Sequence, residues 1–325
     1  STQDLLVQGQ PEVNFPENSD QVCILPTDLP LTIDFSTLYT PVYTTSPFEP
    51  SGYSWTVTGN GVTSADYEFT NGTTDADPFP VITFNSYLDY NIEVTVIGEC
   101  FDPDSDIFTL LAVEIPTITN VDTTETVCDG VETNGFVFTS SMPDDTTFTW
   151  VVSDNSTNIS GYLSGPTTGN LPPQTLSVSD SSQGYVTYEV TPSTPDCTGP
   201  SQNFTIFVNP NPEINNVSEV ICSGSQFADV IPIDGSNGDV VPAGTTYTWG
   251  DPISDPVGVV TGGSAGNDQN SIAGQILTNS TTSPATLTYT VTPTSADGCV
   301  GEDFSVIITV NPTAQVDDPA DQVVC

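Results

Sequence analysis

Apolar and polar residues alternate along many short segments of this chain, and a period of two is typical of β-strands with one buried face. Clear examples are residues 288–292 and 305–310. No segment keeps a convincing helical period for longer than about two turns. Pro and Gly are spread along the chain, as in an all-β protein with many turns. The pattern predicts antiparallel strands packed as two-sheet sandwiches.

Four landmarks recur in the same order and define an internal repeat of about 100 residues, a length that suits one sandwich domain. Successive cysteines of the first landmark lie 105, 94 and 103 positions apart. The landmarks are a first cysteine after an apolar pair (Cys23, Cys128, Cys222, Cys325), an aromatic-x-Trp (Trp55, Trp150, Trp249), an alternating strand leading to a second cysteine (Cys100, Cys197, Cys299), and a last strand closing on proline (Pro116, Pro210, Pro312).

The prolines of the closing strands indicate the domain boundaries. We predict a closing strand of a preceding repeat in 1–11, β-sandwich repeats in 12–115, 116–211 and 212–312, and the opening strand of a further repeat in 313–325. The chain is therefore expected to be a segment of a longer array of such repeats. Because the joints are short, the sandwiches are expected to form an extended, semi-rigid rod.

Composition excludes many functions. The chain has 42 Asp and Glu residues but no Lys, Arg or His. Without imidazole or lysine, it cannot build a Ser-His or Cys-His pair, a His metal ligand or a Schiff base. Without cations it cannot clamp phosphate or neutralise nucleic acid. The remaining carboxylates are scattered over the repeats, so we predict a protein that is not an enzyme and binds no nucleic acid.

The formal charge of −42 keeps copies apart and repels anionic surfaces unless divalent cations bridge them. Acidic surfaces also suit high salt, but halophilic proteins generally retain some Arg and His. An exposed, extracellular location is the preferred interpretation. No run of 18 apolar residues occurs, so we expect no membrane insertion in this segment.

Seven cysteines at repeating positions, without His and without a C-x-x-C pair, indicate disulfides in an oxidising, extracytoplasmic environment. Three pairings are open. Pairing within repeats joins Cys23–Cys100, Cys128–Cys197 and Cys222–Cys299; pairing between neighbouring repeats joins Cys23–Cys197 and Cys128–Cys299; pairing across the joints joins Cys100–Cys128, Cys197–Cys222 and Cys299–Cys325. In an Ig-type sandwich the first and second cysteines lie near opposite ends of the domain, which argues against the first scheme.

Two other groups are candidate sites. Asp102, Asp104 and Asp106 form a D-x-D-x-D run whose alternate oxygens suit Ca²⁺, although the full EF-hand pattern is missing and a solvated acidic turn is the alternative. No cofactor is required, and Ca²⁺ is the one considered. Trp55, Trp150 and Trp249 could stack on sugars, but their recurrence once per repeat predicts core residues.

The motifs resemble the PKD-like and Ig-like tandem repeats of very large Bacteroidetes surface adhesins. The matching features are the opening 218–224 (SEVICSG), the central 245–249 (TTYTW), the turn 290–299 and the closing Val-Asn-Pro strands. The resemblance covers the whole chain and is strongest in the third repeat. The first repeat departs from it, with Val-Ile-Gly-Glu before Cys100 in place of the usual turn. In this group, Asp followed by two Thr suggests O-glycosylation at Thr123 and Thr146.

The resemblance implies a stalk segment of a secreted cell-surface adhesin, of the kind involved in gliding motility and surface attachment. Its partners would be neighbouring repeats of the same chain and, through the parent protein, external surfaces or polysaccharides. An alternative is that the repeats themselves bind polysaccharide or surfaces through Ca²⁺. A third hypothesis is an accessory module of a secreted hydrolase.

Trypsin is expected to leave the chain intact even after reduction and denaturation, because no Lys or Arg is present. A protease specific for acidic residues should degrade the same sample and serves as the control. Electrophoresis and mass spectrometry after overnight digestion test this, and any tryptic fragment would contradict it.

Overall fold

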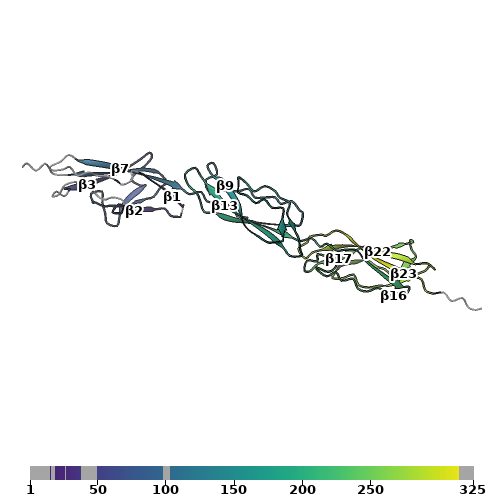
Figure 1. Cartoon of the computed structure of the whole chain (residues 1–325). Coiled ribbons are helices and arrows are strands. Elements are labelled where there is room, and N and C mark those ends of the chain that lie inside the picture. Colours follow the sequence, from purple (N-terminus) through teal and green to yellow (C-terminus); the bar gives the residue numbers. More distant parts are fainter. Residues whose placement is uncertain (1–14, 16–18, 26, 38–49, 98–102, 315–325) are drawn as a thin grey trace, which may run out of the picture. The chain divides into compact units, whose positions relative to one another are not determined.

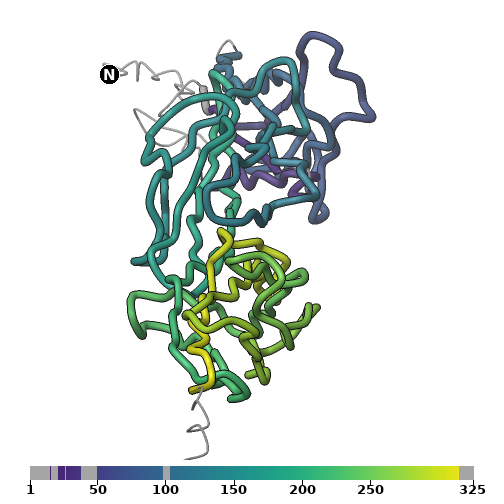
Figure 2. The backbone as a smooth tube through the Cα atoms, turned by 90° about the vertical axis from the view of Figure 1, so that its right-hand side faces the viewer, coloured from purple at the N-terminus to yellow at the C-terminus, as the bar shows by residue number. Residues whose placement is uncertain are grey.

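The computed structural model describes residues 15, 19–25, 27–37, 50–97 and 103–314. Within these residues the chain forms strands, turns and loops and no helix (Figure 1). The backbone trace runs back and forth in extended segments joined by turns (Figure 2). The predicted all-β fold of tandem sandwiches is therefore confirmed.

The first repeat has two sheets with a shared core. One has the strand order β1-β7-β6-β3 and the other β2-β5-β4. Phe84 and Ile82 of the second sheet pack in one cluster with Trp55 of the first, which makes this a sandwich. The strands are β1 (Ser19–Ile24), β2 (Leu31–Asp34), β3 (Gly52–Thr58), β4 (Tyr67–Thr70), β5 (Val81–Phe84), β6 (Asp89–Ile97) and β7 (Asp104–Glu114).

The second repeat has a five-stranded sheet of order β11-β9-β13-β14-β8 and a short pair, β10-β12. Its core includes Trp150, whose ring meets that of Tyr188 edge-on at 5.5 Å, and Phe136, which lies 5.1 Å from Phe204. The strands are β8 (Thr124–Cys128), β9 (Thr147–Asn155), β10 (Ile159–Ser160), β11 (Thr167–Thr168), β12 (Ser177–Val178), β13 (Gly184–Ser193) and β14 (Gln202–Asn209).

The third repeat has the sheet β15-β23-β22-β17-β20, with β18 also paired to β22, and a second sheet β16-β21-β19. Trp249, Tyr289 and Leu277 belong to its core, with Leu277 coming from the second sheet. The strands are β15 (Val217–Cys222), β16 (Ser225–Gln226), β17 (Thr246–Trp249), β18 (Ile253–Asp255), β19 (Val260–Thr261), β20 (Gly266–Gln269), β21 (Ile276–Asn279), β22 (Ala285–Thr294) and β23 (Phe304–Asn311).

The first strand of every repeat pairs in parallel with the last, whereas the sequence predicted only antiparallel strands. The parallel pairs are β1 with β7, β8 with β14, and β15 with β23. Parallel neighbours need a long connection, and the rest of the sandwich supplies it. The parallel ladder places the first cysteine of each repeat beside the end of the last strand, at Val113, Asn209 and Asn311.

Contacts divide the chain into two compact units. The second repeat contributes to both. The first unit comprises Ser1–Asn120, Phe138–Thr149 and Val190–Gln202, and the second comprises Val121–Val137, Trp150–Glu189 and Asn203–Cys325. The repeat boundaries inferred from the sequence stay a prediction.

Buried tyrosines recur in the cores. Tyr188 donates a hydrogen bond to Gln174 Oε1 at 2.8 Å, and Tyr289 donates to Gln275 Oε1 at 3.1 Å. Burial raises the pKa of Tyr188, Tyr247 and Tyr289 to about 12. The same Gln oxygens accept a backbone N–H from Leu163 and Ser264, so this polar pair links two core segments in the same way in both repeats.

These tyrosines predict an alkaline loss of stability between pH 10 and about 12. An unfolded phenol ionises near pH 10.0, whereas the buried ones stay protonated to about 12. Stability is therefore full below pH 10 and falls as the pH rises towards 12. No Lys or Arg titrates in this window. Circular dichroism and tyrosinate absorbance should change together, and Tyr188→Phe should make the loss less steep. Full ionisation of the folded protein near pH 10 would contradict the prediction.

Candidate functional site: the disulfide-bonded joints

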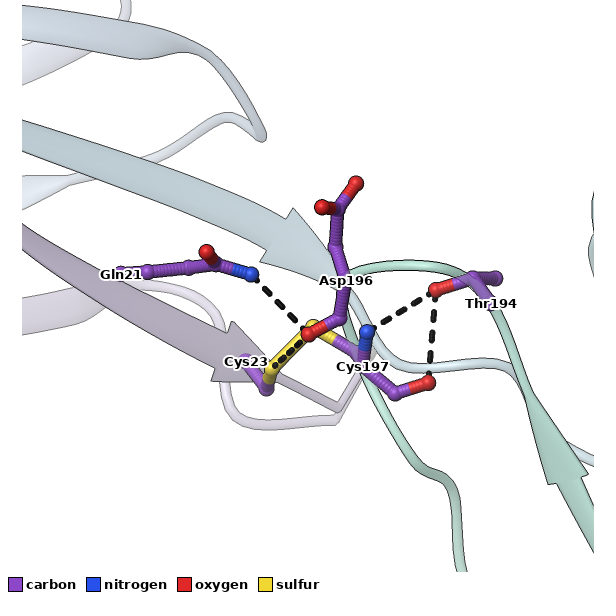
Figure 3. The surroundings of a disulfide bond; sticks show 5 residues. All are labelled: Gln21, Cys23, Thr194, Asp196 and Cys197. Atoms are coloured by element: carbon purple, nitrogen blue, oxygen red, sulfur yellow. Dashed lines mark hydrogen bonds between the residues drawn. A yellow bond between two sulfur atoms is a disulfide. The ribbon is translucent and has the colours of Figure 1, made fainter.

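The first joint is closed by a disulfide between Cys23 and Cys197, with 5.8 Å between their Cα atoms (Figure 3). Cys23 lies at the exposed end of β1. Cys197 lies in the turn between β13 and β14 and is 3% exposed. The bond therefore joins the opening strand of one repeat to a hairpin of the next, inside the first compact unit.

Hydrogen bonds hold the hairpin turn in shape around this bond. The Cys197 amide donates to Thr194 Oγ1 at 3.0 Å, and the Thr194 amide donates to the Cys197 carbonyl at 2.8 Å. Gln21 Nε2 donates across the joint to the Asp196 carbonyl at 3.0 Å (Figure 3). The Cys23 sulfur lies 3.7 Å from that carbonyl, a contact without a proton because the sulfur is disulfide-bonded.

The second joint repeats this arrangement within the second unit. Cys128 at the end of β8 is bonded to Cys299, which is 1% exposed, with 5.6 Å between the Cα atoms. Ser295 takes the place of Thr194. Its Oγ accepts the Cys299 amide at 3.1 Å, and its own amide donates to the Cys299 carbonyl at 2.9 Å. Two turns that differ in length by one residue therefore make the same pair of hydrogen bonds to their cysteine.

A glycine two residues after each of these cysteines allows the joint to close. A Cβ on Gly199 would lie 1.8 Å from the Pro116 carbonyl oxygen, and one on Gly301 would lie 1.9 Å from that of Pro212. Only a residue without a side chain fits such an approach of two backbones. The C-x-G spacing was visible in the sequence at both positions, but its role depends on a proline that is more than 80 residues away.

Of the three pairings considered, the structure contains the bonds between neighbouring repeats. The third repeat shows why pairing within a repeat fails. Cys222 lies beside Asn311 at the end of β23, whereas Cys299 precedes the start of that strand. An eight-residue strand separates the two ends by about 26 Å, far beyond disulfide reach. Cys222 is an exposed free thiol, and Cys100 and Cys325 lie outside the described residues.

The aspartate run is only partly described. Asp102 lies outside the described residues, and Asp104 and Asp106 lie in β7. Asp106 Oδ2 accepts the Phe15 amide at 2.7 Å, and Oδ1 accepts the Ile107 amide at 2.9 Å. Within the described ranges, no group of three or more Cys, Asp or Glu residues is placed to hold a metal ion. Calcium binding by this run stays a prediction.

The two candidate glycosylation sites and the three tryptophans lie within the described residues. Thr123 directly precedes β8 and its carbonyl accepts the Thr205 amide. The Thr146 hydroxyl donates to the Met142 carbonyl and accepts from Ser140, both at 2.7 Å, so a glycan there would replace these bonds. Glycosylation stays a prediction at both positions. The three tryptophans are confirmed as core residues, since Trp55, Trp150 and Trp249 are at most 5% exposed.

The fold and the joints define a class: tandem β-sandwich repeats cross-linked by disulfides, of the type found in oxidising, extracellular settings. The neighbouring repeat is thus a covalent partner of each joint. In the portion of the chain that the structure describes, no helix is long and apolar enough to span a membrane.

A family model for the PKD-like domain matches residues 125–212 and 218–314, together more than half of the chain. The chain belongs to the PKD-like domain family. No curated protein sequence matches it.

Several solved structures are similar over most of the chain. The titin I-band fragment I67–I69 has 10% identity and a TM-score of 0.46, and the match covers 95% of this chain and all of that fragment. Mouse cadherin-23 EC22–24 has 12% identity and a TM-score of 0.30, covering 93% and 98%. The human desmocollin-1 ectodomain has 10% identity and a TM-score of 0.30, covering 93% and 62%.

Gly199→Ala is expected to destabilise the first joint, because the added methyl group would overlap the Pro116 carbonyl. Overpacking of this kind costs about 1–3 kcal/mol. Gly52→Ala is the matched control, since nothing lies within 4 Å of its added Cβ. Thermal unfolding of both variants and the parent measures the difference. An unchanged melting temperature for Gly199→Ala would show that the contact with Pro116 is unimportant.

Proposed function

We propose that this chain is a stalk segment of a large, secreted cell-surface adhesin, most like the gliding-motility adhesin SprB. The observation that carries the proposal is the disulfide between successive sandwiches at both joints. A stalk must hold a distal binding part away from the cell and transmit force, and a covalent cross-link at each joint serves both needs. Membership of the PKD-like domain family supports the proposal.

The charge supports the same role. A formal charge of −42 and the lack of Lys and Arg keep neighbouring stalks apart and remove every tryptic site. Both properties suit a long protein exposed outside the cell. No chemistry is assigned to the repeats themselves, so the proposed role is mechanical and not catalytic.

One observation favours the alternative, that the repeats themselves bind a polysaccharide or surface. A groove of about 350 Å³ in the third repeat runs beside β15. Ile231 and Ile233, both about 60% exposed, line it, and Glu219, Asp229 and Asp239 add carboxylates. These carboxylates are already engaged: Glu219 accepts the Ala228 amide, Asp229 the Gly274 amide, and Asp239 the Asn215 amide.

Binding of the purified chain to a panel of polysaccharides and abiotic surfaces, first with Ca²⁺ and then with EDTA, separates the two functions. The stalk proposal expects no saturable binding, or dissociation constants weaker than about 1 mM. Saturable binding that EDTA abolishes would overturn it. In that case Ile233→Ser, in the groove, and Asp104→Asn, in the aspartate run, show which region binds.

A further inference from the structure

The two disulfides connect strands that already run side by side. In each repeat the first strand leads to the first cysteine, and the last strand begins within five residues of the second cysteine where that cysteine is described. The first and last strands are hydrogen-bonded neighbours and run in the same direction. Each joint is therefore crossed twice, once by the peptide chain and once by a disulfide.

Two continuous paths of covalent bonds, called line A and line B, run through the protein. Line A runs along β1, crosses the Cys23–Cys197 disulfide into β14, and continues through the peptide linker into β15. Line B runs along β7, continues through the peptide linker into β8, and crosses the Cys128–Cys299 disulfide into β23. At each joint one line is a peptide and the other a disulfide, and the two exchange these roles at the next joint.

We propose that lines A and B carry tension through the protein as a two-stranded covalent cable, so that opening a sandwich releases almost none of its chain. The remaining strands of each repeat are then loops outside the loaded path. The stalk role proposed above supplies the source of the load. The path itself follows from the connectivity and can be tested on the isolated protein.

The second repeat shows the size of the effect. Line B passes through it as 116–128 and line A as 197–212, while residues 129–196 lie in neither line. Even fully stretched, the thirteen residues 116–128 span only about 45 Å. Without the disulfides the path would be the whole repeat, residues 116–211, which spans about 330 Å when stretched.

Both lines are nearly extended before any load is applied. Strands β8 and β14 rise about 3.3 Å per residue, close to the limit of an extended chain. Five successive register pairs, from Thr124 with Thr205 to Cys128 with Asn209, hold the lines together. Tension then acts along covalent bonds, and the buried residues of β13, such as Val190, lie outside the path.

In the second repeat, either line alone is sufficient to connect the first repeat to the third. If Cys128–Cys299 is removed, line A still ties the first repeat to the third through residues 197–212. If Cys23–Cys197 is removed, line B still does so through residues 116–128. While the first and third repeats stay folded, only the loss of both disulfides puts residues 129–196 under load.

Single-molecule force spectroscopy on the full chain, flanked at both ends by cysteine-free reference domains, tests the cable. Val190→Ala, at a fully buried position, weakens the second repeat so that it opens first. This variant is compared with the same variant carrying Cys23→Ser and Cys197→Ser, or Cys128→Ser and Cys299→Ser, or all four. Non-reducing peptide maps verify the bonds in each sample, and reduced wild-type protein provides a second disulfide-free sample if a variant fails to fold.

The first opening step should lengthen the chain by less than about 25 Å with both disulfides or with either one alone. It should reach about 300 Å when both are absent. A first step of about 65 Å in the oxidised protein, as expected for a bond closed within the second repeat, would overturn the proposal. So would a first step of about 300 Å after the loss of one disulfide, because the weakened second repeat opens first. Neither result would bear on the stalk role, which the binding experiment tests separately.

Discussion

The parallel pairing of the first and last strand in each repeat is the constraint on which the rest of the structure depends. This pairing puts the first cysteine at the end where the last strand finishes and the second cysteine at the end where it starts. A disulfide needs Cα atoms within about 7 Å, so Cys128 cannot meet Cys197 and Cys222 cannot meet Cys299. The cysteines that can meet belong to neighbouring repeats, and the joints become covalent cross-links.

In the absence of cationic side chains, amide and hydroxyl groups stabilise the carboxylates. With no Lys, Arg or His, carboxylates cannot form side-chain ion pairs and accept hydrogen bonds from amides and hydroxyls instead. Glu125 accepts from the Asn134 amide at 2.7 Å, and Glu219 from the Ala228 amide at 3.0 Å, which ties the first strand to the next segment in both repeats. Hydrogen bonds from the Val241 amide and the Ser181 hydroxyl hold the pKa of Asp234 below its usual value. These hydrogen bonds stabilise the charged carboxylates and, at the same time, the local backbone structure around them.

Much of the fold was predictable because its signals are local. The alternation around Tyr289 and the recurrence of Trp55, Trp150 and Trp249 identified strands and core positions, since burial of one strand face imposes a period of two. The joints were predictable only in part. The sequence showed that cysteines recur and that C-x-G follows four of them, but not which cysteines meet or that Gly199 faces Pro116.

The sequence by itself determined the repeat, the strand pattern, the core aromatics and the use of cysteine for cross-linking, because each is written in neighbouring residues or in their spacing. The tertiary structure alone decided the parallel pairs and the disulfide partners. Those choices join residues 81 to 174 positions apart. They depend on which sheet edge is open and which end of the next repeat faces it, and no local pattern encodes either.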